Sequence, residues 1–184
     1  MSKKDRQRWD AKWQDRQAGE QPAGWLVRHR ALLQGGIAAE LACGRGGDAL
    51  WLAQQGYQVL AVDGSSVALR QAQRRARDSG LHNILFVHAD LDHWRLPPRS
   101  VELLTVFRFL DRELFPMIRE AVRPGGLVVY QTRTVRWLER EPDASLLYLL
   151  ESDELRQRFA GWEILDYEEE DVSDAIVARR PELS

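Results

Sequence analysis

Short runs of apolar residues alternate with amphipathic stretches along most of the chain. The apolar runs predict buried strands at residues 37–41, 57–62, 84–87, 101–107 and 127–132. Amphipathic periodicity and capping residues predict helices at residues 5–18, 25–33, 49–55, 114–122 and 152–159. A further helix is predicted to begin after a cap at Ser65 or Ser66 and to run to about Asp78. Apolar strands that alternate with helices are typical of a parallel sheet covered on both faces. The pattern therefore predicts an α/β fold.

The last segment of the chain departs from this alternation. Residues 162–167 and 172–178 are both strand-like, and only the acidic turn 168–171 separates them. Two strands joined by so short a link predict an antiparallel hairpin at one edge of the sheet. No linker or repeat interrupts the chain, so we expect a single domain. Its expected parts are an N-terminal helical segment (1–34), a core (35–133), and a C-terminal helix with the edge hairpin (134–184).

Composition limits the classes of partner. A net charge of −2 does not indicate a strongly basic nucleic-acid binder. The single cysteine, Cys43, excludes an intramolecular disulfide and is typical of a reducing compartment. The first 13 residues lack the apolar core of a signal peptide, and no apolar run approaches the roughly 20 residues of a membrane helix. We therefore expect a cytoplasmic protein without a membrane partner.

A glycine-rich segment follows the first predicted strand and precedes a predicted helix. Its pattern Ala42-x-Gly44-x-x-Gly47 nearly matches the dinucleotide-binding fingerprint, with alanine in place of the first glycine. Such a turn presents backbone N–H groups and a helix N-terminus to a ligand. Glu40 lies just before the turn, where a buried carboxylate needs a polar partner. That partner is either the ammonium group of an amino-acid-like ligand or a local arginine.

Two aspartates end the next two predicted strands. Asp63 follows Gly44 by 19 residues, and a carboxylate at this position can accept both hydroxyls of a ribose. The alternative is an ordinary strand-end or helix-capping aspartate, although Ser65 can supply the cap instead. Asp90 could accept the exocyclic amine of an adenine. Its alternative is an ordinary polar residue, because His88, Asp92 and His93 surround it; we expect no metal site there, since no further ligands are visible.

Taken in order, these motifs resemble those of the class I S-adenosylmethionine-dependent methyltransferases. The matching segments, from the first motif to the turn into the fifth strand, are 40–47, Asp63, 89–91, 101–107 and 123–127. Within that family the chain is similar to the small tellurite-resistance and thiopurine-type methyltransferases, through residues 8–13 and 109–112. Two departures are Ala42, which is small, and Arg108, which precedes the Phe-Leu-Asp-Arg stretch.

The resemblance implies a Rossmann-like α/β fold whose seven-stranded sheet is mostly parallel, with an antiparallel last strand. It implies S-adenosylmethionine as the cofactor, with its methionine end near Glu40, its ribose on Asp63 and its adenine near Asp90. The implied cofactor-binding residues are Glu40, Ala42, Cys43, Gly44, Gly46, Asp63, Gly64, Ser65, Asp90, Leu91 and Phe107.

Methyl transfer from a sulfonium needs alignment and exclusion of water rather than a protein nucleophile. The sequence fits this requirement, and we interpret Cys43 as a small filler residue. No catalytic residue is assigned. A general base would be needed only for a protonated acceptor, and its candidates are Asp111, Tyr130 and His29.

We expect a small-molecule methyl acceptor, bound by a monomer or weak homodimer. The residues expected to contact the acceptor are Trp9, Trp13, Arg108, Arg112 and Arg133. The segment after the fourth strand lacks the Asn-Pro-Pro-Tyr pattern of nucleic-acid amine methyltransferases, and no inserted recognition segment is evident. We therefore expect no nucleic-acid partner.

Two other functions share the fold. A non-catalytic module that binds S-adenosylmethionine would need the same pocket residues. An NAD(P)-dependent oxidoreductase is less consistent with the chain, because every lysine lies in the first 12 residues and the usual Tyr-x-x-x-Lys pairing is missing.

Overall fold

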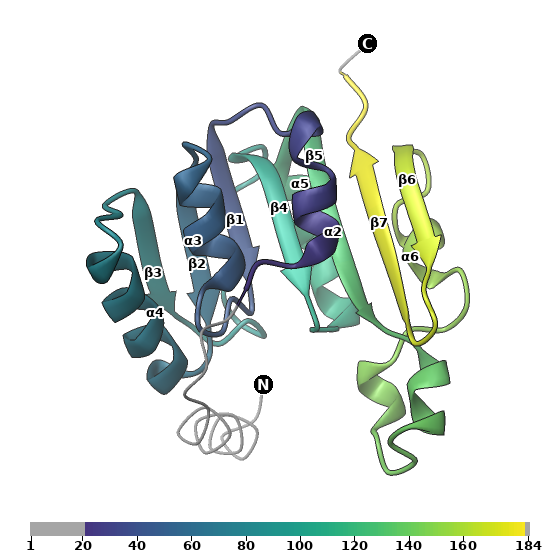
Figure 1. The fold of residues 1–184 in the computed structure, drawn as a ribbon. Coiled ribbons are helices and arrows are strands. Elements are labelled where there is room, and N and C mark those ends of the chain that lie inside the picture. The colour runs from purple at the N-terminus through teal and green to yellow at the C-terminus, as the bar shows by residue number, and fades with distance from the viewer. Residues whose placement is uncertain (1–20, 183–184) are drawn as a thin grey trace. The chain divides into compact units, whose positions relative to one another are not determined.

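The computed structural model describes residues 21–182 (Figure 1). Its strands are β1 (Ile37–Leu41), β2 (Gln58–Asp63), β3 (Ile84–His88), β4 (Val101–Phe107), β5 (Val122–Arg133), β6 (Glu163–Glu169) and β7 (Ser173–Arg179). Its α-helices are α2 (Gly24–Arg28), α3 (Gly47–Gln54), α4 (Ser66–Asp78), α5 (Phe115–Ala121) and α6 (Glu154–Arg158). Short 3₁₀ helices are η1 (Arg30–Leu32), η2 (Arg112–Leu114), η3 (Val135–Glu139) and η4 (Leu146–Tyr148).

The strands form a seven-stranded sheet in the order β3-β2-β1-β4-β5-β7-β6, in which β7 is antiparallel to both of its neighbours. This topology confirms the predicted α/β methyltransferase fold and its antiparallel last strand. The described residues fall into two compact units that divide after Arg95. We call residues 21–95 the first unit and residues 96–182 the second unit; the expected single domain stays a prediction.

In the first unit, β1, β2 and β3 run parallel, and α3 covers β1 and β2 while α4 covers β2 and β3 (Figure 1). The strands are fully apolar at their centres, and Leu41, Ala61 and Val62 have no exposed surface. Helix α4 begins where the sequence predicts, because Ser65 caps it by accepting a hydrogen bond from the Ala68 N–H at 3.2 Å.

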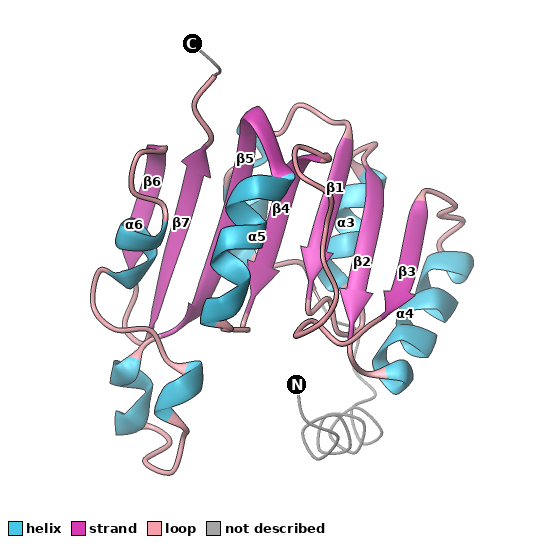
Figure 2. Cartoon of the chain, turned by 180° about the vertical axis from the view of Figure 1, so that it is seen from behind, coloured by secondary structure: helices cyan, strands magenta, loops and turns pink. Residues whose placement is uncertain are grey.

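In the second unit, β4 pairs in parallel with β5, and the β6–β7 hairpin pairs antiparallel with β5 through β7. The predicted edge hairpin is therefore confirmed. Helix α5 lies against β4 and β5 on the face seen in Figure 2. The rings of Phe115 and Tyr130 stack with 5.5 Å between their centroids, and the Phe159 ring packs edge-on against Phe115 with 5.9 Å between centroids. An aromatic cluster therefore fills this core.

Strand β5 begins at Val122, five residues earlier than the predicted 127–132. The Pro-Gly-Gly sequence was expected to form a turn, but the backbone at Gly126 instead approaches the carbonyl oxygen of Glu102 closely enough to exclude a side chain. The predicted helix 25–33 divides at His29 into α2 and η1. None of the helices in residues 21–182 is both long and apolar enough to cross a membrane.

Candidate functional site

The glycine turn connects β1 to α3 through backbone conformations that are rare for residues with a side chain. Ala42, Gly44 and Gly46 have φ values of 53°, 53° and 71°, all left-handed. The Cys43 N–H donates to the Val62 carbonyl at 3.0 Å, which ties the turn to β2. Helix α4 also supports the turn, because the Arg75 guanidinium donates to the Arg45 carbonyl at 2.7 Å. Arg75 lies too far along the chain for any sequence pattern to have linked it to the turn.

Asp63 joins the ends of all three strands of the first unit. Its Oδ2 accepts the Gly44 N–H at 2.7 Å, and its Oδ1 accepts the Ser65 N–H at 2.7 Å. Its backbone oxygen accepts the Ala89 N–H, just after β3, at 3.1 Å. A carboxylate has about four acceptor sites, so these two bonds do not fill it. The predicted residues Gly44, Asp63 and Ser65 are therefore brought together.

Ala42 has a left-handed backbone, which explains why the family pattern has a glycine at this position. A left-handed φ brings the Cβ of any L-residue too close to the following carbonyl oxygen, at a cost of roughly 1 kcal/mol. We expect Ala42→Gly to raise the free energy of unfolding by about 1 kcal/mol, measured by urea denaturation. Ala38→Gly in β1, where φ is not positive, should destabilise the protein instead. A loss of stability in Ala42→Gly would contradict the strain at this position.

The remaining predicted cofactor residues of the first unit lie near the strand ends. Glu40 is 3% exposed within β1, and Cys43 is 5% exposed, which fits a filler role. The Asp90 Oδ1 accepts the Asp92 N–H at 3.2 Å, so the carboxylate helps to shape the turn after β3. Leu91 is buried next to it. Their contacts with a cofactor stay predictions.

The loop after β4 belongs to the second unit and contains a strained residue. Arg108 has a φ of 57°, and its N–H donates to the Gln131 carbonyl at 2.9 Å. Its side chain is exposed, whereas that of Phe107 before it is buried. The predicted contact of Arg108 with the acceptor stays a prediction.

Two of the candidate general bases, Tyr130 and Asp111, form hydrogen bonds within the second unit. Burial, together with the nearby Asp111 carboxylate, raises the pKa of Tyr130 far above its usual value, and its hydroxyl donates to the Phe109 carbonyl at 2.9 Å. The phenol therefore stays protonated and cannot act as a base. Asp111 caps η2 by accepting the Glu113 N–H at 3.0 Å. The third candidate, His29, is buried in the first unit, with its Nδ1 at 2.8 Å from the Trp25 carbonyl.

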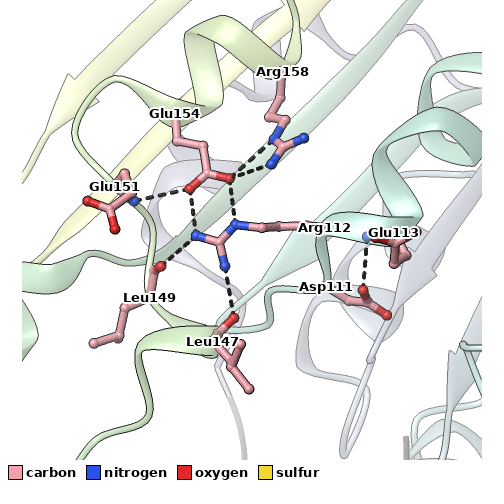
Figure 3. Close-up of polar contacts among 8 residues, drawn as sticks. All are labelled: Asp111, Arg112, Glu113, Leu147, Leu149, Glu151, Glu154 and Arg158. Carbon is pink, nitrogen blue, oxygen red and sulfur yellow. Dashed lines mark hydrogen bonds and ion pairs between the residues drawn. The ribbon is translucent and has the colours of Figure 1, made fainter.

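The predicted contact of Arg112 with the acceptor stays a prediction, and its guanidinium makes several contacts within the second unit. It donates through Nε and Nη2 to Glu154, at 2.8 and 2.7 Å, and to the carbonyls of Leu147 and Leu149 (Figure 3). Four donated hydrogen bonds leave one of its five N–H groups for a ligand. Burial raises the pKa of Glu154, but the hydrogen bonds from Arg112, from the Glu151 N–H and from Arg158 outweigh it and lower the pKa overall.

Arg133 extends from the end of β5 over the face of Trp137, with 3.6 Å between the guanidinium carbon and the ring centre. It also pairs with Glu141 at 3.8 Å, and its side chain is 46% exposed. A stacked, exposed guanidinium of this kind is suited to an anionic group. Trp9 and Trp13 lie outside the described residues. Within residues 21–182, no cluster of three or more His, Cys, Asp or Glu side chains could hold a metal ion.

Comparison with known proteins identifies a family whose model matches the part of the chain that contains the predicted cofactor-binding residues. A family model described as a methyltransferase domain matches residues 38–126, which include the glycine turn, Asp63 and Asp90. The chain is 32% identical over 144 residues to Hemagglutinin 1 of Eikenella corrodens, covering 71% of this chain and 45% of that protein. It is 44% identical over 52 residues to the 23S rRNA (uracil(1939)-C(5))-methyltransferase RlmD of Shewanella sediminis, covering 28% of this chain and 12% of RlmD. The chain thus spans less than half the length of these curated relatives.

Solved structures share the fold. One comes from a study of the conversion of a disulfide bond into a thioacetal group during echinomycin biosynthesis. It has a TM-score of 0.74 at 24% identity, and the similarity covers 97% of this chain and 94% of the chain in that structure. TehB from Haemophilus influenzae also has a TM-score of 0.74, at 17% identity, covering 86% of this chain and 62% of TehB. With residues 38–126 matching the methyltransferase domain model, the chain belongs to the class I S-adenosylmethionine-dependent methyltransferases.

Proposed function

We propose that the protein transfers a methyl group from S-adenosylmethionine to a small-molecule acceptor by in-line displacement. The observation that carries this proposal is the set of hydrogen bonds by which Asp63 joins the ends of β1, β2 and β3 around the glycine turn. A carboxylate at the centre of such an arrangement is suited to the two hydroxyls of a ribose.

The chemistry of the first unit fits the cofactor. The turn supplies backbone N–H groups without large side chains, and Glu40 supplies a buried carboxylate for an ammonium group. Asp63 would hold the ribose, while Asp90 and Leu91 would lie by the adenine. S-adenosylmethionine supplies an activated methyl group on a positively charged sulfur. The task of the chain's own residues is then to bind, to orient and to exclude water.

The acceptor side is proposed to involve two exposed cations, Arg108 just after β4 and Arg133 at the end of β5. Tyr130 is protonated and the Asp111 carboxylate caps η2, so we do not assign a general base to the second unit. An acceptor that is already an anionic nucleophile needs no base. Thiolates, carboxylates and chalcogen oxyanions meet this requirement, and an arginine can bind each of them.

The test is a transfer assay with S-adenosylmethionine carrying an isotopic label on its methyl group. The panel should contain thiols, chalcogen oxyanions and small carboxylic acids, with rRNA fragments as the alternative acceptor, since RlmD acts on rRNA according to its name. We expect label in a small-molecule product. Label found only in RNA would overturn the proposed acceptor class. If the protein binds S-adenosylhomocysteine but transfers no label to any acceptor, the result would support a non-catalytic binding module.

A further inference from the structure

The Glu154 side chain of the second unit accepts five hydrogen bonds. It lies at the start of α6 and is only 7% exposed. Its Oε1 accepts from the Arg112 Nε at 2.8 Å and from the Arg158 Nε and Nη2 at 3.2 and 2.9 Å. Its Oε2 accepts from the Arg112 Nη2 at 2.7 Å and from the Glu151 N–H at 3.1 Å (Figure 3). These bonds use the full acceptor capacity of the carboxylate.

Through Arg112, this carboxylate connects the loop after β4 to a segment far along the chain. The Arg112 Nη1 donates to the Leu147 carbonyl at 3.0 Å, and its Nη2 donates to the Leu149 carbonyl at 2.9 Å. Figure 3 shows the guanidinium lying between these carbonyls and Glu154. Because a guanidinium is planar, a bidentate pair of this kind fixes its direction as well as its position.

The loop itself, residues 108–112, is fixed at its other end as well. The Arg108 N–H donates to the Gln131 carbonyl, and the Tyr130 hydroxyl donates to the Phe109 carbonyl, each at 2.9 Å. Between these anchors Arg108 keeps its left-handed backbone. Strain of this kind persists only when the surrounding structure holds it, and it is typical of functional loops. The Arg112–Glu154 pair is the anchor at the C-terminal end of the loop.

We propose that Glu154 is a positioning residue that holds the loop 108–112, through Arg112, in the conformation that presents Arg108 to the methyl acceptor. The proposal rests on the proposed function for the identity of the ligand. Its structural part, that one buried carboxylate controls the order of this loop, can be tested without any acceptor.

The test is hydrogen exchange measured by mass spectrometry on the full chain. In Glu154→Gln the side chain keeps its shape but has one acceptor oxygen and no charge. We expect the amides of the loop and of η2 to exchange about tenfold faster, since local opening becomes easier, while β4, β5 and β7 keep their protection. Glu163→Gln removes an exposed ion pair with Arg179 in the same unit and should leave the loop unchanged.

Two further variants separate positioning from general stability. Glu154→Asp keeps the carboxylate and should restore part of the loop protection. Arg112→Lys keeps the charge but loses the planar fork, so it should loosen the loop as Glu154→Gln does, and it replaces that variant if Glu154→Gln does not fold. Unchanged loop exchange, or equally faster exchange throughout the second unit, would overturn the proposal.

The functional readout uses the acceptor found in the transfer assay. Glu154→Gln should raise KM for that acceptor while its affinity for S-adenosylhomocysteine stays within about twofold of the unmodified protein. Weaker cofactor binding with an unchanged acceptor KM would overturn the positioning role. If the unmodified protein binds no S-adenosylhomocysteine, the proposed function fails, and the exchange experiment still decides whether Glu154 orders the loop.

Discussion

Replacing Asp63 with alanine should weaken the binding of S-adenosylhomocysteine at least tenfold, about 1.4 kcal/mol. The variant loses the proposed ribose acceptor. It also releases the N–H groups of Gly44 and Ser65, which the two carboxylate oxygens now accept at 2.7 Å, so the glycine turn loses a support. Asp63→Asn is the finer test, because its amide retains only one acceptor oxygen and should fall between alanine and the unmodified protein. Calorimetric titration measures all three affinities.

The control for Asp63 is Asp78→Ala, which removes an exposed carboxylate at the opposite end of α4 and should not change the affinity. Circular dichroism should first show that each variant is folded. An Asp63→Ala protein that is folded and binds S-adenosylhomocysteine as tightly as the unmodified protein would refute the ribose assignment. Asp63 would then be a structural residue that only holds the turn.

Gly126→Ala should lower the free energy of unfolding by about 2 kcal/mol or more. A Cβ at this position would lie 2.8 Å from the Glu102 carbonyl oxygen, 2.8 Å from a Val122 methyl carbon and 2.9 Å from the Arg123 carbonyl oxygen. Two of these three atoms belong to the backbone and cannot rotate away. Relief of the clash would therefore require β5 to move from β4, with loss of ladder hydrogen bonds. Urea denaturation gives the change directly.

Gly24→Ala is the matched control for Gly126→Ala, because it makes the same chemical change where a Cβ would meet no atom within 4 Å. It should be neutral or slightly stabilising, since alanine favours the helix in which Gly24 lies. Equal stabilities of the two variants would show that β4 and β5 do not approach each other as closely at Gly126 as the structure has them.

The elements best predicted from the sequence are those with strong local signals. Strands β1 and β4 are mostly apolar, and both have the predicted bounds. Helix α4 begins at a serine cap and ends before a glycine, so its bounds also agree with the prediction. The association of Gly44 with Asp63 followed from parallel strands, whose carboxyl ends must lie at one edge of the sheet.

What the sequence could not reveal depends on partners distant in the chain. Arg112 and Glu154 are 42 residues apart, and no periodicity links them, so the sequence does not reveal this ion pair. The early start of β5 depends on the close approach of Gly126 to Glu102, while the Pro-Gly-Gly sequence locally favours a turn. The left-handed backbone of Arg108 is likewise held by tertiary contacts, because arginine has no intrinsic preference for it.

The central claim is that the first unit forms an S-adenosylmethionine site around Asp63. Isothermal titration calorimetry of the full chain with S-adenosylhomocysteine, and separately with NADH, tests it most directly. The account predicts saturable binding of S-adenosylhomocysteine at a single site, at least tenfold weaker binding in Asp63→Ala, and no binding of NADH. Binding of NADH without binding of S-adenosylhomocysteine would contradict it.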